Sequence, residues 1–132
     1  MKKVDHIGIA VRSINEVLPY YTETLGCPLL KIEEVESQKV RVAFIDAGNI
    51  KLELLEPMDR AGAVYKFIEK RGEGIHHIAF GVDDIESRMK ELRDNGVQLL
   101  SEHANPGAGG ALVAFLHPKS SNGVLYELCE KH

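Results

Sequence analysis

The fold can be inferred from the stretch DHIGIAVRSINEV at residues 5–17, because the chain repeats its pattern as HHIAFGVDDIESR at residues 76–88. In this alignment His6 falls on His77, 71 residues later, and the apolar positions that follow also coincide. A repeat of this length indicates a duplicated structural unit. The chain therefore predicts two copies of one fold unit.

Two further matches support the duplication. The segment VAFI at Val42–Ile45 recurs as VAFL at Val113–Leu116, again 71 residues later. KLELLE, which begins at Lys51, resembles LYELCE, which begins at Leu125, and here the spacing is 74 residues. The three extra residues fit in the loop HPKSSNG, since loops accept insertions that strands do not.

Each copy reads as a strand, a helix and three more strands, the order βαβββ. In the first copy Ser13 and Glu16 have the spacing of a capping box, and Pro19 is expected to bend the helix that follows. In the second copy Asp84 is expected to cap the helix. The strands are expected at Val4–Val11, Leu29–Glu34, Val40–Asp46, Ile50–Leu55, Ile75–Val82, Val97–Glu102, Ala111–Leu116 and Val124–Cys129. We expect a single domain over residues 1–132, with module 1 at about 1–58, a linking helix at about 61–71 and module 2 at about 74–132.

Composition excludes several classes of function. The net charge of −4 gives no basic surface for nucleic acid or an anionic membrane. No apolar run approaches the roughly 18 residues of a membrane span. Cys27 and Cys129 are too few for a disulfide framework, which favours a reducing compartment. We expect a cytoplasmic protein with no nucleic-acid or membrane partner.

The two adjacent histidines, His76 and His77, point to opposite faces of their strand. His77 shares a face with the small residues Ala79 and Gly81, as His6 does with equally small neighbours. A packed core face would carry large apolar side chains. We therefore expect His6 and His77 to face an open, concave surface, and we expect His76 to lie outside the site.

The last strand of each copy carries a glutamate between apolar residues, Glu53 in the first and Glu127 in the second. A carboxylate in such a place should be exposed, paired or bound to a cation, because unpaired burial costs several kcal/mol. Together with His6 and His77 these residues form an N₂O₂ donor set. That set suits a divalent ion such as Zn, Co, Mn, Ni or Fe, with positions left open for water or substrate.

This arrangement resembles the vicinal oxygen chelate (glyoxalase/bleomycin resistance/dioxygenase) superfamily. The segments VDHIGIAV, KLELLEP, GIHHIAFGVDDI, GVQLL and above all FLHPKSSNGVLYELCE resemble methylmalonyl-CoA epimerases. The resemblance implies an α+β fold in which two tandem βαβββ modules form a concave, partly open mixed β-sheet barrel around a metal site. Proteins of this superfamily often form homodimers, so the resemblance also implies a homodimer.

The resemblance also implies an activity. It points to interconversion of (2R)- and (2S)-methylmalonyl-CoA through a metal-stabilised enolate, with His6, Glu53, His77 and Glu127 as ligands of Co, Zn, Mn or Ni. Glu127 is the expected base. Inversion also needs a second acid or base, and Val42 stands where some relatives are proposed to carry a glutamate, so none is assigned. Lys119 is a candidate contact for the phosphates of the acyl-CoA substrate.

Two other functions remain open. A glyoxalase I-type lyase acting on a thiol hemithioacetal would use the same four ligands, although the HPKSSNGVLYEL string favours the epimerase. A metal-free protein that sequesters a ligand, as some resistance proteins do, usually lacks the ligands that are present here. A dioxygenase is disfavoured, since those enzymes usually have a three-ligand iron site and a longer chain.

Overall fold

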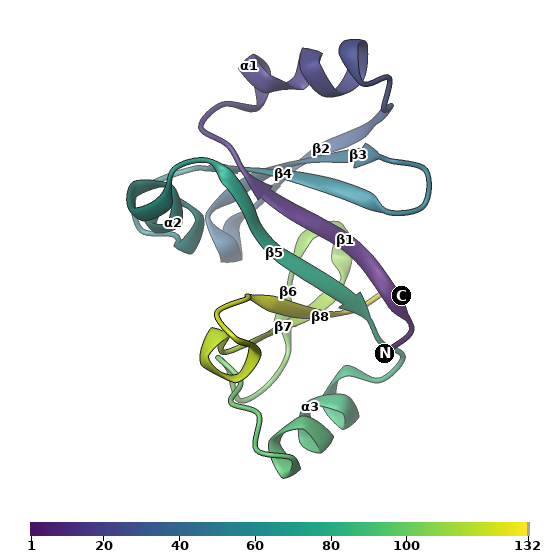
Figure 1. Cartoon of the computed structure of the whole chain (residues 1–132), viewed down its shortest axis with the longest axis vertical. Helices are drawn as coiled ribbons and strands as arrows, with labels where there is room; N and C mark the ends of the chain where they lie inside the picture. Colours follow the sequence, from purple (N-terminus) through teal and green to yellow (C-terminus); the bar gives the residue numbers. More distant parts are fainter. Residues whose placement is uncertain (132) are drawn as a thin grey trace. The chain divides into compact units, whose positions relative to one another are not determined.

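The computed structural model describes residues 1–131 and has a mixed α+β fold (Figure 1). Its elements are β1 (Lys3–Ala10), α1 (Ile14–Pro19), β2 (Leu29–Val35), β3 (Val40–Asp46), β4 (Lys51–Pro57), α2 (Ala63–Arg71), β5 (Gly74–Gly81), α3 (Ile85–Asp94), β6 (Asn105–Pro106), β7 (Leu112–Leu116) and β8 (Tyr126–Glu130). The order is βαβββ twice with α2 between the copies, which confirms the predicted duplication. Among residues 1–131, no helix is both long enough and apolar enough to cross a membrane.

The chain divides into two compact units. The first unit runs from His6 to His76, and the second combines Met1–Asp5 with the chain from His77 onward. Backbone and ionic contacts attach the first residues to the second unit, since the N–H of Lys2 donates to the carbonyl of Gly81 at 2.9 Å. The ammonium of Lys2 also lies 3.0 Å from a carboxylate oxygen of Asp83. Strand β1 therefore begins in one unit and ends in the other.

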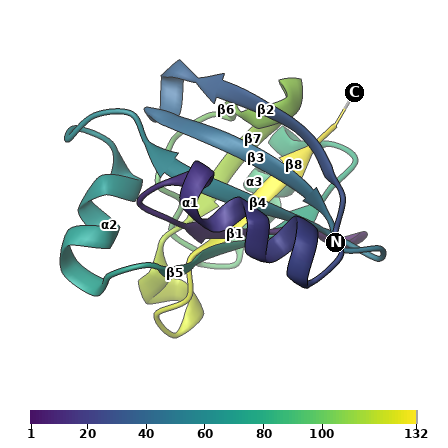
Figure 2. The same ribbon diagram turned by 90° about the horizontal axis from the view of Figure 1, so that it is seen from above.

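The first unit has the strand order β2-β3-β4-β1, with β1 parallel to β4 and the other neighbours antiparallel. Alternation along the strands divides its side chains between two faces. One face packs beneath α1 (Figure 2). Its buried core consists of Val11, Ile14, Ala43, Ile45 and Leu54. The opposite face carries His6 and Glu53.

The second unit repeats this plan with the strand order β5-β8-β7-β6, and β5 runs parallel to β8. Helix α3 contacts β7 and β8. The core on the α3 side consists of Val82, Ile85, Met89, Ala114, Leu116 and Leu128. His77 and Glu127 lie on the face away from this core. In each unit, therefore, the helix leaves one sheet face to the candidate site residues.

Helices α1 and α3 begin where the sequence predicts. The hydroxyl of Ser13 accepts from the N–H of Glu16 at 3.3 Å, and a carboxylate oxygen of Asp84 accepts from the N–H of Ser87 at 3.1 Å. The α-helical pattern of α1 ends at Pro19, and a π-helical turn continues over Tyr20–Thr24. Proline lacks the N–H that an interior α-helical bond needs, which accounts for the change of pattern.

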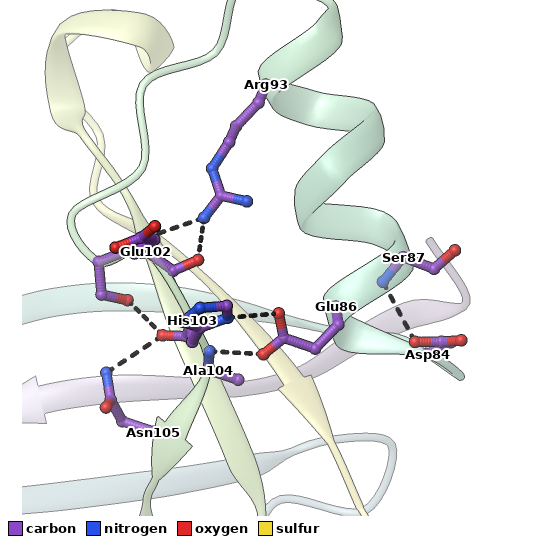
Figure 3. A network of polar contacts seen from close by, with 9 residues as sticks. Asp84, Glu86, Ser87, Arg93, Glu102, His103, Ala104 and Asn105 are labelled. Atoms are coloured by element: carbon purple, nitrogen blue, oxygen red, sulfur yellow. Dashed lines mark hydrogen bonds and ion pairs between the residues drawn. The ribbon is translucent and has the colours of Figure 1, made fainter.

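One predicted strand is wrong. The segment Val97–Glu102 forms only an isolated bridge between Leu99 and Leu116, and β6 is two residues long. Side chains of α3 capture the backbone of this segment and of the residues that follow it (Figure 3). A carboxylate oxygen of Glu86 accepts from the N–H of Ala104 at 2.9 Å, and Arg93 donates to the carbonyls of two residues, Ser101 and Glu102.

The Glu86 carboxylate is also held by His103, whose Nδ1 lies 3.3 Å from it. The N–H of Ala104 and then the His103 ring lower the pKa of Glu86 below its ordinary value, because both favour the charged carboxylate. Backbone groups that a regular strand would pair with a neighbouring strand are thus satisfied by a helix side chain.

Candidate functional site

The first candidate pair, His6 and Glu53, comes from neighbouring parallel strands. The register of β1 and β4 places Gly8 opposite Glu53, so that His6, two residues before Gly8 on β1, lies on the same face. Nδ1 of His6 is 3.2 Å from Oε2 of Glu53. Only 4% of His6 and 6% of Glu53 are exposed, so this is a buried contact between an imidazole and a carboxylate.

The second pair, His77 and Glu127, repeats this geometry in the second unit. The register of β5 and β8 places Ala79 opposite Glu127, as Gly8 lies opposite Glu53 in the first unit. Nε2 of His77 is 3.4 Å from Oε1 of Glu127, and 6% and 3% of the two residues are exposed. All four side chains are more deeply buried than the small neighbouring residues predict.

An aromatic ring accompanies each pair. Phe44 on β3 lies directly opposite Glu53, and Phe115 on β7 lies directly opposite Glu127. The Phe115 ring packs edge-on against His77, with ring centres 5.5 Å apart, which contributes to the burial of that histidine. The VAFI and VAFL repeats contain these two residues, but their place beside the glutamates follows only from the antiparallel register.

Sequence reasoning missed two glutamates, one in each unit. Each connects the strand that carries the candidate glutamate to the first helix of its unit. Glu56, three residues after Glu53, accepts from the N–H of Ile14 at 2.7 Å, at the start of α1. Glu130, three residues after Glu127, accepts from the N–H of Ile85 at 2.8 Å, at the start of α3. The first N–H groups of a helix have no partner within the helix, and a carboxylate there is favourable. The signal was the final glutamate shared by KLELLE and LYELCE.

Three other residues considered from the sequence have different surroundings. His76 packs edge-on against Phe67 of α2, with ring centres 5.0 Å apart, so it lies apart from the pairs as expected. Lys119 is exposed in a short 3₁₀ turn at Pro118–Ser121, where its N–H donates to Nδ1 of His117 at 3.0 Å. Val42 is fully buried and apolar.

The donor geometry within each unit fits a divalent metal ion. Nitrogen and oxygen ligands of zinc-like ions lie about 2.1 Å from the metal, so two ligand atoms at a tetrahedral angle are about 3.4 Å apart. The observed contacts, 3.2 Å for His6 and Glu53 and 3.4 Å for His77 and Glu127, match this spacing. Imidazole nitrogen with carboxylate oxygen is also a donor set that such ions accept.

Comparisons with known proteins identify the family of the chain. Residues 5–115 match the family described as the glyoxalase/bleomycin resistance protein/dioxygenase superfamily. The chain is 47% identical over 130 residues to the uncharacterized protein YqjC of Bacillus subtilis, a match that covers 98% of this chain and 93% of that one. It is 37% identical over 128 residues to the ethylmalonyl-CoA/methylmalonyl-CoA epimerase of Cereibacter sphaeroides, which covers 96% of both.

The chain is also similar to a solved structure of an enzyme with a bound ligand. The enzyme is a variant of the Streptomyces coelicolor methylmalonyl-CoA epimerase, bound to 2-nitronate-propionyl-CoA. That structure matches this chain with a TM-score of 0.93 and 38% identity, over 99% of this chain and 98% of the other. On this evidence the chain belongs to the glyoxalase/bleomycin resistance/dioxygenase superfamily.

Proposed function

We propose that the chain is a metal-dependent epimerase that interconverts (2R)- and (2S)-methylmalonyl-CoA. The observation that carries the proposal is the buried histidine–glutamate pair, which occurs at equivalent positions in both units. Relatives with this activity, at 37% and 38% identity over nearly the whole chain, supply the substrate class.

In this proposal His6, Glu53, His77 and Glu127 together hold one divalent ion, which is Co, Zn, Mn or Ni. Burial favours this role, since a carboxylate removed from water is stabilised by a nearby cation. A bound ion of this kind supplies Lewis-acid stabilisation of negative charge on the substrate oxygens.

Glu127 acts as a base in the proposal. The α-C–H bond of the substrate breaks as the Glu127 carboxylate gains the proton, and the electron pair is delocalised into the thioester carbonyl. Phe115 lies directly opposite Glu127 on the neighbouring strand, and only 3% of Glu127 is exposed to water. Such exclusion strengthens charge interactions inside a site. Lys119, exposed on its turn, is the proposed contact for the phosphates of coenzyme A. A homodimer and a cytoplasmic location stay predictions.

The test is deuterium exchange. Protein loaded with Co²⁺ is added to methylmalonyl-CoA in D₂O, and loss of the α-proton signal is followed by NMR beside the apoprotein and Glu127→Gln. We expect exchange that requires both the metal and Glu127. Absence of exchange above background with fully metallated protein would contradict the proposal. Activity on a thiol hemithioacetal instead would favour the lyase. A purified protein that contains no metal and has no affinity for metal would favour a ligand-sequestering protein.

A further inference from the structure

Inversion at a carbon atom by proton transfer needs one group that removes a proton from one face and one that delivers a proton to the other. Glu127 supplies only the first. The second group must present a titratable side chain on the same sheet face as the metal ligands. The first unit offers such a face beside His6 and Glu53, and its strand register identifies which residues share it.

The face can be followed from Glu53 across two strands, because directly opposed residues of antiparallel strands share a face. β3 places Phe44 opposite Glu53. Val42 lies two residues from Phe44 and therefore on the same face. β2 in turn places Glu33 opposite Val42. Glu33 thus projects from the same face as Glu53.

Three carboxylates share this face among the described strand residues of the first unit, namely Glu33, Asp46 and Glu53. Glu53 is a proposed ligand. Asp46 stands at the end of β3 and accepts from the N–H of Gly48 at 2.8 Å, so it serves its own turn. The other strand carboxylates, Glu34 and Glu56, alternate to the α1 face. Elimination therefore leaves Glu33.

The surroundings of Glu33 hold it toward the face. Its side chain is 30% exposed, and its Oε1 lies 3.5 Å from the ammonium of Lys31. The same ammonium lies 5.1 Å from the centre of the Phe44 ring, beside Glu53 in the register. On a flat sheet the Cα atoms of Glu33 and Glu53 would be about 12 Å apart, from spacings of about 4.8 Å per strand and 3.4 Å per residue. Val42 and Phe44 lie on the same face between these two glutamates.

We propose that Glu33 is the second acid–base residue of the epimerase, an inference that rests on the proposed function. After Glu127 has taken the α-proton, the carboxylic acid of Glu33 gives its proton to the opposite face of the carbon, and a new C–H bond forms from the substrate's delocalised electron pair. Glu33 becomes a carboxylate and Glu127 stays protonated until each exchanges with water. The reverse direction uses the same two groups with their roles exchanged.

The test compares wild type, Glu33→Gln and Glu34→Gln, each loaded with Co²⁺ in D₂O and given each pure epimer. NMR measures deuterium entry at the α-carbon, and chromatography of the two diastereomeric thioesters measures inversion. We expect Glu33→Gln to lower inversion by about 100-fold or more, the usual scale of one acid–base group. It should still introduce deuterium into one epimer with retention of configuration. Glu34→Gln is the matched control, since Glu34 is exposed and lies opposite Arg41 on the other face, and it should match wild type.

Other outcomes overturn the inference in distinguishable ways. If Glu33→Gln inverts either epimer at a rate within about threefold of the wild-type rate, Glu33 is not the second acid–base group and the proposed function stands. If the variant loses bound metal, or loses exchange with both epimers while retaining metal and its circular dichroism spectrum, Glu33 has another role. If the metal-loaded wild type neither exchanges nor inverts the substrate, the proposed function fails and the inference fails with it.

Discussion

Two adjacent histidines in one strand have opposite surroundings, and this contrast separates a site residue from a packing residue. His77 faces a buried carboxylate at 3.4 Å, whereas His76 rests against the Phe67 ring. The difference arises from strand alternation alone, which turns consecutive side chains to opposite faces. The two adjacent histidines therefore offer an internal comparison, because His77 is expected to bind metal and His76 is not.

Replacing His77 by alanine should abolish metal binding, and replacing His76 should leave it unchanged. Loss of an outer-shell partner already weakens metal affinity by roughly 10–100-fold, so loss of a ligand should cost at least about 100-fold. His76→Ala should lower only stability, by about 0.5–1.5 kcal/mol for the lost aromatic contact. Calorimetric titration with Co²⁺ and Zn²⁺ checks both variants. Equal affinities in the two variants would contradict the assignment of His77 as a ligand.

Within each unit, the last strand is fastened to the first helix by one carboxylate. Glu56 reaches the start of α1 from 42 residues further along the chain, and Glu130 reaches the start of α3 from 45 residues further along. Each lies three residues beyond a proposed metal ligand on the same strand. The bond therefore fixes the strand that carries Glu53 or Glu127 relative to the helix and to the strand before it.

Glu130→Ala should destabilise the protein by about 1–2 kcal/mol, because the N–H of Ile85 loses its acceptor at a helix start. Glu130→Gln keeps an acceptor but loses the charge, so it should cost less, about 0.3–1 kcal/mol. Chemical denaturation measures both values. The control is Glu69→Ala, an exposed position on α2 that should change stability by less than about 0.5 kcal/mol. An alanine variant at position 130 no less stable than this control would contradict the fastening role.

Local pattern was enough to predict most elements of this chain, but not the contacts between distant segments. The duplication, the caps at Ser13 and Asp84 and a disturbance of the first helix at Pro19 are all visible in short stretches of sequence. The failed strand at Val97–Glu102 contains a short apolar run, yet side chains of α3 compete for the backbone around it, and a local pattern contains no information about that competition. The role of Glu130 was hidden for the same reason, since only the register of β5 and β8 brings it to the start of α3.

At the scale of the whole molecule, the two units contribute equally to the proposed centre. One unit supplies His6 and Glu53, and the other supplies His77 and Glu127. Two arrangements are consistent with two such pairs, namely one ion with four protein ligands or two ions with two ligands each. The proposed function favours one ion with four protein ligands. A substrate that chelates an ion needs a stably bound ion with open coordination positions, and two protein ligands alone hold an ion weakly.

The one-centre proposal predicts that the metal stabilises both units together. Titration should give one ion per chain, and saturation at about 100 times the dissociation constant should add about 2.7 kcal/mol of stability, which a chelator removes. Hydrogen exchange should show metal-dependent protection in both β4 and β8. In His6→Ala that protection should disappear from both strands, although the substitution lies in the first unit. His103→Ala, at an exposed histidine of the loop after α3, is the control and should retain it. Two ions per chain, with protection lost from β4 alone in His6→Ala, would instead mean that each unit binds its own metal.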